Sequence, residues 1–163
     1  MSSLSRSATT RLLIFSGCLA VCASTAAAQM THFSKKLDRH QVDCLKRLWH
    51  ASRWKYLPES YSEMMKITQV KTAMLNDRER PDYIYLFEDD GWCGTAGCPL
   101  LIGESQRDGN CRLLYDDMGD ASFTVLRRRD HGYRRIYAPC EARFDGHQYQ
   151  QLHEECPNLE VHH

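Results

Sequence analysis

The apolar residues of the chain are spaced in three different ways. They form a dense stretch over residues 12–21, recur at helical spacing over residues 38–56, and fall in short segments from residue 67 onward. A dense stretch, a helical repeat and short β-rich segments each predict a different kind of structure. We therefore expect an N-terminal segment, one main helix and a region of strands.

The helical repeat predicts an amphipathic helix over residues 38–56. Asp38 is a suitable N-cap because its side chain can accept a hydrogen bond from the first turn, and Pro58 follows the expected end. A second, short helix is expected over residues 59–66. Cys44 lies beside the apolar face of the first helix, so a disulfide there would attach this helix to the rest of the protein. That apolar face consists of Val42, Leu45, Leu48 and Trp49.

Seven short segments rich in β-branched and aromatic residues predict strands. Turn-forming Asp, Asn and Gly residues separate most of them. Strands that follow one another without intervening helices form an antiparallel meander, and the N-terminal helix packed on such a sheet gives the α+β class. Residues 148–153 are expected to form either an edge strand or a short helix. The seven strand segments are residues 67–75, 83–88, 99–103, 111–115, 122–128, 133–138 and 141–144.

The N-terminus has the three parts of a secretory signal peptide. Arg6 and Arg11 precede the apolar stretch, and Ala26, Ala27 and Ala28 form a small-residue cleavage site. The apolar stretch is half of the about 20 residues that a membrane-spanning helix needs. We expect residues 1–28 to be cleaved, which leaves residues 29–163 as a single domain with no transmembrane segment.

Two alternatives to this cleavage remain. Phe15-Ser16-Gly17-Cys18 resembles a bacterial lipobox, and cleavage there would leave Cys18 lipidated. The apolar run ahead of Cys18 is only a few residues long, which favours the signal peptide. The other alternative is a buried N-terminal helix. The signal peptide predicts a periplasmic or secreted protein, and the lipobox predicts a lipoprotein.

The charge balance excludes one class of partner. The chain has 21 Lys and Arg and 21 Asp and Glu, and both basic residues of the first 28 lie in the predicted signal peptide. Residues 29–163 thus carry a formal net charge of −2. A nucleic-acid binder neutralises many phosphates with excess basic residues, so we expect no nucleic-acid partner.

Six cysteines remain after the expected cleavage. An even number in an exported chain predicts three disulfides, with fifteen possible pairings. A zinc site is disfavoured because no Cys-x-x-Cys pair is present, and we expect no metal or other cofactor. Proximity favours a bond between Cys93 and Cys98. Cys140 with Cys156 is the next choice, and elimination then leaves Cys44 with Cys111.

The most distinctive segment is residues 92–98, Trp-Cys-Gly-Thr-Ala-Gly-Cys. Gly94 and Gly97 permit a tight reversal, so we expect a rigid disulfide-closed loop between two strands. Trp92 would either cover the core or stand exposed as an anchor, and Thr95 and Ala96 are small. The loop is either a preorganised recognition element, whose rigidity lowers the entropy lost on binding, or a staple of the hairpin without a partner.

This segment and its flanks resemble a group of small exported proteobacterial proteins with a Cys-Gly-x-x-Gly-Cys loop between strands. The resemblance covers roughly residues 70–150 and implies architecture and compartment only. The loop is also similar, more loosely, to the Cys-x4-Cys loop of periplasmic inhibitors of vertebrate-type lysozyme. Their loop carries a histidine that this one lacks, so the similarity implies a mode of binding and no target. The runs of sequence that carry the resemblance to the exported proteobacterial proteins begin at Asp82, Gly91, Phe123, Gly132 and Arg143.

Two clusters of charged residues complete the candidates. Residues 127–129 are three arginines on a predicted hairpin, where alternation would place Arg127 and Arg129 on one face. Asp89 and Asp90 could instead supply the carboxylates of a small envelope hydrolase. We assign no catalytic residues. The sequence favours an exported protein that binds an envelope or host protein through Trp92 and its loop, with a purely structural envelope or virulence factor as a further alternative.

Overall fold

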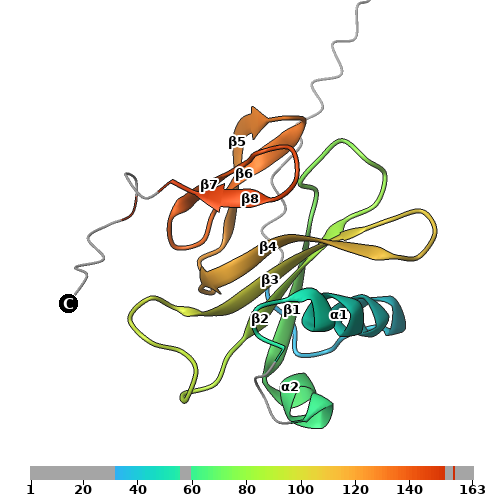
Figure 1. The fold of residues 1–163 in the computed structure, drawn as a ribbon, viewed down its shortest axis with the longest axis vertical. Helices are drawn as coiled ribbons and strands as arrows, with labels where there is room; N and C mark the ends of the chain where they lie inside the picture. The colour runs from blue at the N-terminus through green and yellow to red at the C-terminus, as the bar shows by residue number, and fades with distance from the viewer. Residues whose placement is uncertain (1–31, 56–59, 153–155, 157–163) are drawn as a thin grey trace, which may run out of the picture.

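The computed structural model describes residues 32–55, 60–152 and 156 of the chain. Within them lie two helices and two four-stranded antiparallel sheets, which confirms the expected α+β class (Figure 1). The predicted signal peptide of residues 1–28 and the lipobox lie outside the described residues. No helix in the described ranges is long and apolar enough to cross a membrane.

Helix α1 (Arg39–Ala51) begins at the expected cap. The Asp38 side chain accepts a hydrogen bond from the Gln41 backbone at 2.9 Å, and the Gln41 side chain accepts one from the Asp38 backbone at 2.8 Å. This reciprocal capping box satisfies two amides that the helix itself leaves unpaired. The helix ends at Ala51, five residues before the expected end at position 56. There Ser52 caps it, because its backbone amide and its hydroxyl both donate hydrogen bonds to the Trp49 carbonyl.

Helix α2 (Tyr61–Ile67) is short and leads directly into the first strand. The Ser60 hydroxyl accepts a hydrogen bond from the Glu63 backbone, which caps the helix at its start. At the other end the Thr68 hydroxyl donates to the Met64 carbonyl at 2.6 Å. Met64 of α2 is fully buried, and Met65 and Ile67 are partly buried against the same core.

The first sheet contains four strands in chain order. They are β1 (Thr68–Ala73), β2 (Asp82–Phe87), β3 (Cys98–Ser105) and β4 (Cys111–Gly119). β4 runs four residues beyond the expected end at position 115, because β3 begins at Cys98 and pairs with β4 as far as Gly119. Met118 and Gly119, expected in a turn, are therefore strand residues. An irregularity in register separates Ile102 from Gly103.

The second sheet follows with the same simple order. Its strands are β5 (Thr124–Asp130), β6 (Tyr133–Tyr137), β7 (Glu141–Phe144) and β8 (Tyr149–Gln151). β8 lies within residues 148–153, so a strand forms there and not a helix. A turn with left-handed backbone at His131 and Gly132 joins β5 to β6.

The first sheet is buried on both faces. On one face, side chains such as Ile84, Leu100 and Ile102 pack against residues of the second sheet, among them Ile136 and Phe144. Alternate residues of the same strands face the helices, because successive side chains of a strand point to opposite sides. The helix-side core contains Leu45, Leu48, Trp49, Met64, Val70, Tyr85, Phe87 and Leu101.

Three disulfides link these elements, and their presence confirms the expectation from the even number of cysteines. Cys44–Cys111 joins α1 to β4, Cys93–Cys98 closes the β2–β3 loop, and Cys140–Cys156 ties the C-terminal segment to the residues between β6 and β7. These are the three pairs named in the sequence analysis. Disulfides of this number suit an oxidising compartment outside the cytoplasm.

Candidate functional site

The loop closed by Cys93–Cys98 is constrained twice. Besides the disulfide, the Gly94 amide donates to the Gly97 carbonyl at 2.8 Å and the Gly97 amide donates to the Gly94 carbonyl at 3.0 Å. Gly97 has φ +102°, and a Cβ there would lie 2.4 Å from the Gly119 carbonyl oxygen. Only glycine fits that position, so the loop rests directly on the end of β4.

The residues of this loop differ in exposure. Thr95 is exposed at the turn of the loop, and Ala96 is half-buried. Trp92 is also half-buried and packs against the helix-side core. Trp92 therefore covers the core beside the loop, and Thr95 is the residue that the loop presents to solvent.

The two carboxylates of the hydrolase alternative lie just before the loop. The Asp89 carboxylate accepts a hydrogen bond from the Gly91 amide at 2.8 Å, and its carbonyl accepts bonds from the Trp92 and Cys93 amides. Asp89 is thus used to form the turn that leads into the loop. Asp90 is exposed.

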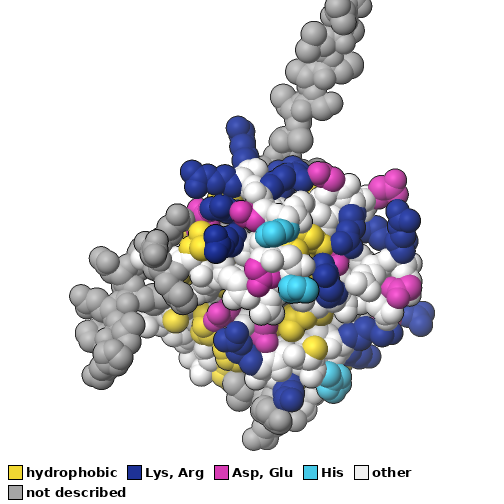
Figure 2. All heavy atoms as spheres, turned by 45° about the horizontal axis from the view of Figure 1, so that its top comes forward, with side chains coloured by type: hydrophobic (Ala, Val, Ile, Leu, Met, Phe, Trp, Pro, Cys, Tyr) yellow, Lys and Arg dark blue, Asp and Glu magenta, His cyan; other side chains and the backbone are white. Residues whose placement is uncertain are grey.

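The arginines of β5 do not simply alternate between faces. The register of β5 against β6 is irregular between Val125 and Arg129, and residues 127–129 are all exposed. Arg129 donates two hydrogen bonds of 2.7 Å to the Asp77 carboxylate, and these bonds lower the pKa of Asp77. Arg129 therefore links β5 to the β1–β2 loop. Figure 2 shows that Lys and Arg side chains are interspersed with Asp and Glu on the face it presents.

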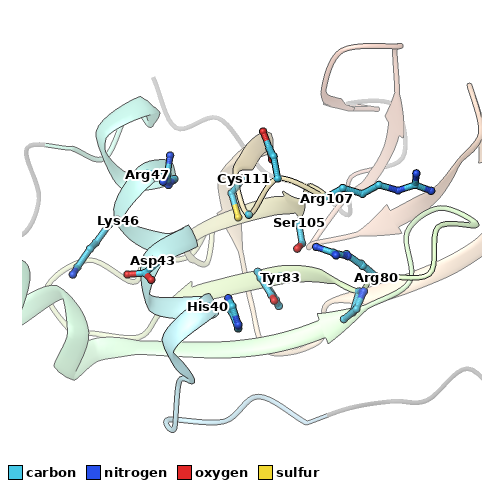
Figure 3. Close-up of a pocket in the computed structure, with 12 residues that line it drawn as sticks. His40, Asp43, Lys46, Arg47, Arg80, Tyr83, Ser105, Arg107 and Cys111 are labelled. Atoms are coloured by element: carbon cyan, nitrogen blue, oxygen red, sulfur yellow. The ribbon is translucent and has the colours of Figure 1, made fainter.

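A groove between α1 and the first sheet was not anticipated from the sequence. Its volume is about 970 Å³, and basic residues exceed acidic ones along it by four to two. Figure 3 shows Arg47 on the helix side, and Arg80 and Arg107 on the sheet side. A smaller hollow of about 520 Å³ adjoins it and shares Arg80, Ser105 and Arg107. The residues that line the main groove are His40, Asp43, Lys46, Arg47, Arg80, Pro81, Tyr83, Ser105, Arg107, Asp108, Gly109 and Cys111.

The residues that α1 contributes to this groove could be grouped from their spacing in the sequence. His40, Asp43 and Arg47 lie three and four residues apart, which places them on one polar face of α1. The sheet half has no such signal, because Arg80 and Arg107 lie on separate loops. Only the fold brings them together.

A buried ionic network joins the two sheets. The carboxylate of Glu104 on β3 is 1% exposed and accepts bonds from Arg78 at 2.7 Å and from Arg112 at 3.0 Å. The Tyr133 hydroxyl on β6 also donates to it. The same hydroxyl accepts hydrogen bonds from both guanidinium groups, at 2.7 and 2.9 Å. Burial and the neighbouring Glu104 carboxylate raise the pKa of Tyr133 to about 12.

Asp82 lies beside this network and is also 1% exposed. Its carboxylate accepts hydrogen bonds from the Leu75 amide at 3.2 Å and from the Asn76 side chain at 3.5 Å. Burial raises the pKa of Asp82 to about 7, opposed by the Leu75 hydrogen bond and assisted by the negative charge of Glu104. No motif in the sequence indicated a role for Asp82, Glu104 or Tyr133.

Within the part of the chain that the structure describes, no cluster of three or more His, Cys, Asp or Glu side chains could hold a metal ion. No family model matches the chain. A search of curated proteins and a search of solved structures likewise find no match.

Proposed function

We propose that the chain is an exported binding protein, periplasmic or secreted, that contacts an envelope or host protein through the loop closed by Cys93–Cys98. The observation that carries this proposal is the double constraint on the loop, a disulfide together with paired hydrogen bonds between Gly94 and Gly97. The constraint leaves Thr95 exposed. A loop already fixed in one conformation loses little entropy when a partner binds it.

Three other observations support an exported role. The three disulfides suit an oxidising compartment, and the first 28 residues have the order of a signal peptide. The third observation is that the loop resembles the Cys-Gly-x-x-Gly-Cys loop of small exported proteobacterial proteins. Inhibitor, immunity and host-interaction roles all use binding of this kind.

The packing of Trp92 changes which residue tests the proposal. Because Trp92 packs against the helix-side core, replacing it would disturb the fold as well as the surface. Thr95 is exposed and Ala96 half-buried, so Thr95 is the more informative site. Arg127, which is also exposed, is a second surface residue that a partner would reach.

The experiment places a photo-crosslinking amino acid at Thr95 and, as a matched control, at the exposed Thr124 on β5. The purified exported protein is incubated with envelope extract or host fluid, irradiated and examined by mass spectrometry. The proposal expects one partner that crosslinks when the photo-crosslinking amino acid is at Thr95 and not when it is at Thr124. Binding of that partner to the protein without the crosslinker should be lost in Thr95→Arg. Identical products at both sites, or none at Thr95, would contradict it.

A further inference from the structure

The groove between α1 and the first sheet has more basic than acidic side chains along it. Arg47, Arg80 and Arg107 line it, and none of the three forms an ion pair with a carboxylate of the described residues. Some exposed arginines elsewhere in the protein do pair with acids, as Arg129 does with Asp77. The groove thus gathers several basic side chains that are available to a ligand.

Two of these arginines are held in place by neutral oxygen atoms. Arg47 donates to the side-chain oxygen of Asn110 at 2.7 Å, and Arg80 donates to the Gln106 carbonyl at 3.1 Å. Each bond uses one guanidinium nitrogen and leaves the positive charge in place. A guanidinium has five N–H donors, so both side chains keep donors for a ligand.

The acids of the groove are engaged by other groups. Both oxygens of Asp108 accept hydrogen bonds from Asn110, one from its amide backbone and one from its side chain, and these bonds lower the pKa of Asp108. Asp43 lies 4.0 Å from Arg39, which does not line the groove. Asp108 thus orients Asn110, and Asn110 in turn orients Arg47.

The two walls of the groove are joined covalently at its floor. Cys44 on α1 is bonded to Cys111 on β4, and Cys111 itself lines the groove. α1 also approaches the sheet closely, since a Cβ on Gly103 would lie 2.3 Å from the Leu48 side chain. The spacing between α1 and the first sheet is therefore set by the fold.

We propose that this groove binds a phosphorylated ligand, with its phosphate groups held between Arg47 on one wall and Arg80 and Arg107 on the other. Arginine suits this chemistry because its planar fork donates two parallel hydrogen bonds to phosphate oxygens. The hydroxyl groups of Tyr83 and Ser105 also line the groove and supply neutral donors. The site uses residues other than those of the Cys93–Cys98 loop, so it stands independently of the binding role proposed above.

The primary test titrates inorganic pyrophosphate into the purified exported protein by calorimetry. We expect saturable binding at one site, weakened about tenfold or more in Arg47→Gln and in Arg80→Gln, because each loses a hydrogen bond to a charged group. Arg128→Gln is the matched control, since it removes the same charge from an exposed residue that does not line the groove. It should bind as the wild type does. Thermal unfolding of each variant shows that it is folded.

A second arm separates two sources of the phosphate. Vesicles of phosphatidylcholine with and without phosphatidic acid are sedimented with the wild type and the three variants. Binding that depends on Arg47 and Arg80 in the vesicle arm alone assigns a lipid headgroup, and in the pyrophosphate arm alone a soluble phosphate compound. The proposal is overturned if neither probe binds, if Arg128→Gln weakens binding as much as Arg47→Gln does, or if citrate binds as tightly as pyrophosphate.

Discussion

The disulfide between Cys44 and Cys111 is expected to contribute more to stability than the other two. The perturbation is the double variant Cys44→Ala, Cys111→Ala, which removes the only covalent link between α1 and β4 in the described part of the chain. In the chain-entropy account, a disulfide stabilises by restricting the unfolded chain, and the effect grows with the length of the closed loop.

The magnitude follows from the sequence separations. A separation of 67 residues corresponds to about 4.4 kcal/mol at 25 °C, and a separation of 5 residues, as in Cys93–Cys98, to about 2 kcal/mol. Cys93→Ala, Cys98→Ala is therefore a matched control with the same chemical change. Cys44 is buried, so the small cavity left by alanine adds to the larger of the two losses.

The assay is urea unfolding followed by tryptophan fluorescence, with the free energy of unfolding extrapolated to zero denaturant. We expect the Cys44 and Cys111 variant to lose about 2 kcal/mol more than the control variant. The m-value should rise, because the unfolded chain becomes less restricted and exposes more surface. Equal losses in the two variants, or a larger loss in the control, would refute the reasoning.

Three further predictions concern the loop and the buried network. Gly97→Ala should lower the free energy of unfolding by about 1–3 kcal/mol, because alanine is strained at positive φ. Gly94→Ala, where a Cβ meets no atom within 4 Å, should change the free energy of unfolding by no more than about 0.5 kcal/mol. Similar losses for the two variants in urea unfolding would contradict this prediction. Glu104→Gln should cost about 1–3 kcal/mol, because it removes the buried charged acceptor of the hydrogen bonds from Arg78, Arg112 and Tyr133. Asp77→Asn, at an exposed ion pair, should cost less than about 1 kcal/mol, and a reversed order would disprove the assignment. The raised pKa of Asp82, about 7, means that the folded state holds a proton which the unfolded state releases above about pH 4. This contribution to stability is complete below about pH 4 and is lost as the pH rises through about 7. Asp82→Asn should therefore flatten the dependence of the free energy of unfolding on pH. An unchanged dependence would show that Asp82 does not cause it.

The parts of the fold that the sequence predicted are those set by local chemistry. The start of α1 depends on Asp38 and Gln41, which lie three residues apart in the chain and form the capping box. The strands depend on β-branched and aromatic segments bounded by turn residues. Both kinds of signal act over a few residues, so they can be recognised without knowing the rest of the structure.

The predicted end of α1 at position 56 was wrong because a residue distant in the sequence helps to determine where the helix ends. Beyond Ser52, the Arg53 amide donates to the Asp116 carboxylate on β4 at 2.6 Å, which turns the chain away from the helix. Likewise, β4 extends to Gly119 because Leu100 and Gly97 of the preceding segment pack against that residue. Such long-range contacts override local pattern and leave no mark in the nearby sequence.

The candidate sites divide in the same way. The loop at residues 92–98 could be identified because its cysteines and glycines are close in the chain. The groove and the Glu104 network could not, because each draws single charged residues from several segments. Arg80 and Arg107 look like ordinary loop arginines until the fold places them along one groove.

The order of the three disulfides along the chain has a consequence for how the protein is made. Cys93–Cys98 lies entirely within the interval from Cys44 to Cys111, and Cys140–Cys156 begins only after both. No bond interleaves with another, so closing one never requires the chain to pass through a ring formed by another. For a chain that emerges N-terminus first, both bonds of the first sheet have their partners before Cys140 appears. The cysteines of the sheet that carries the loop and the groove can therefore pair correctly before the second sheet is complete.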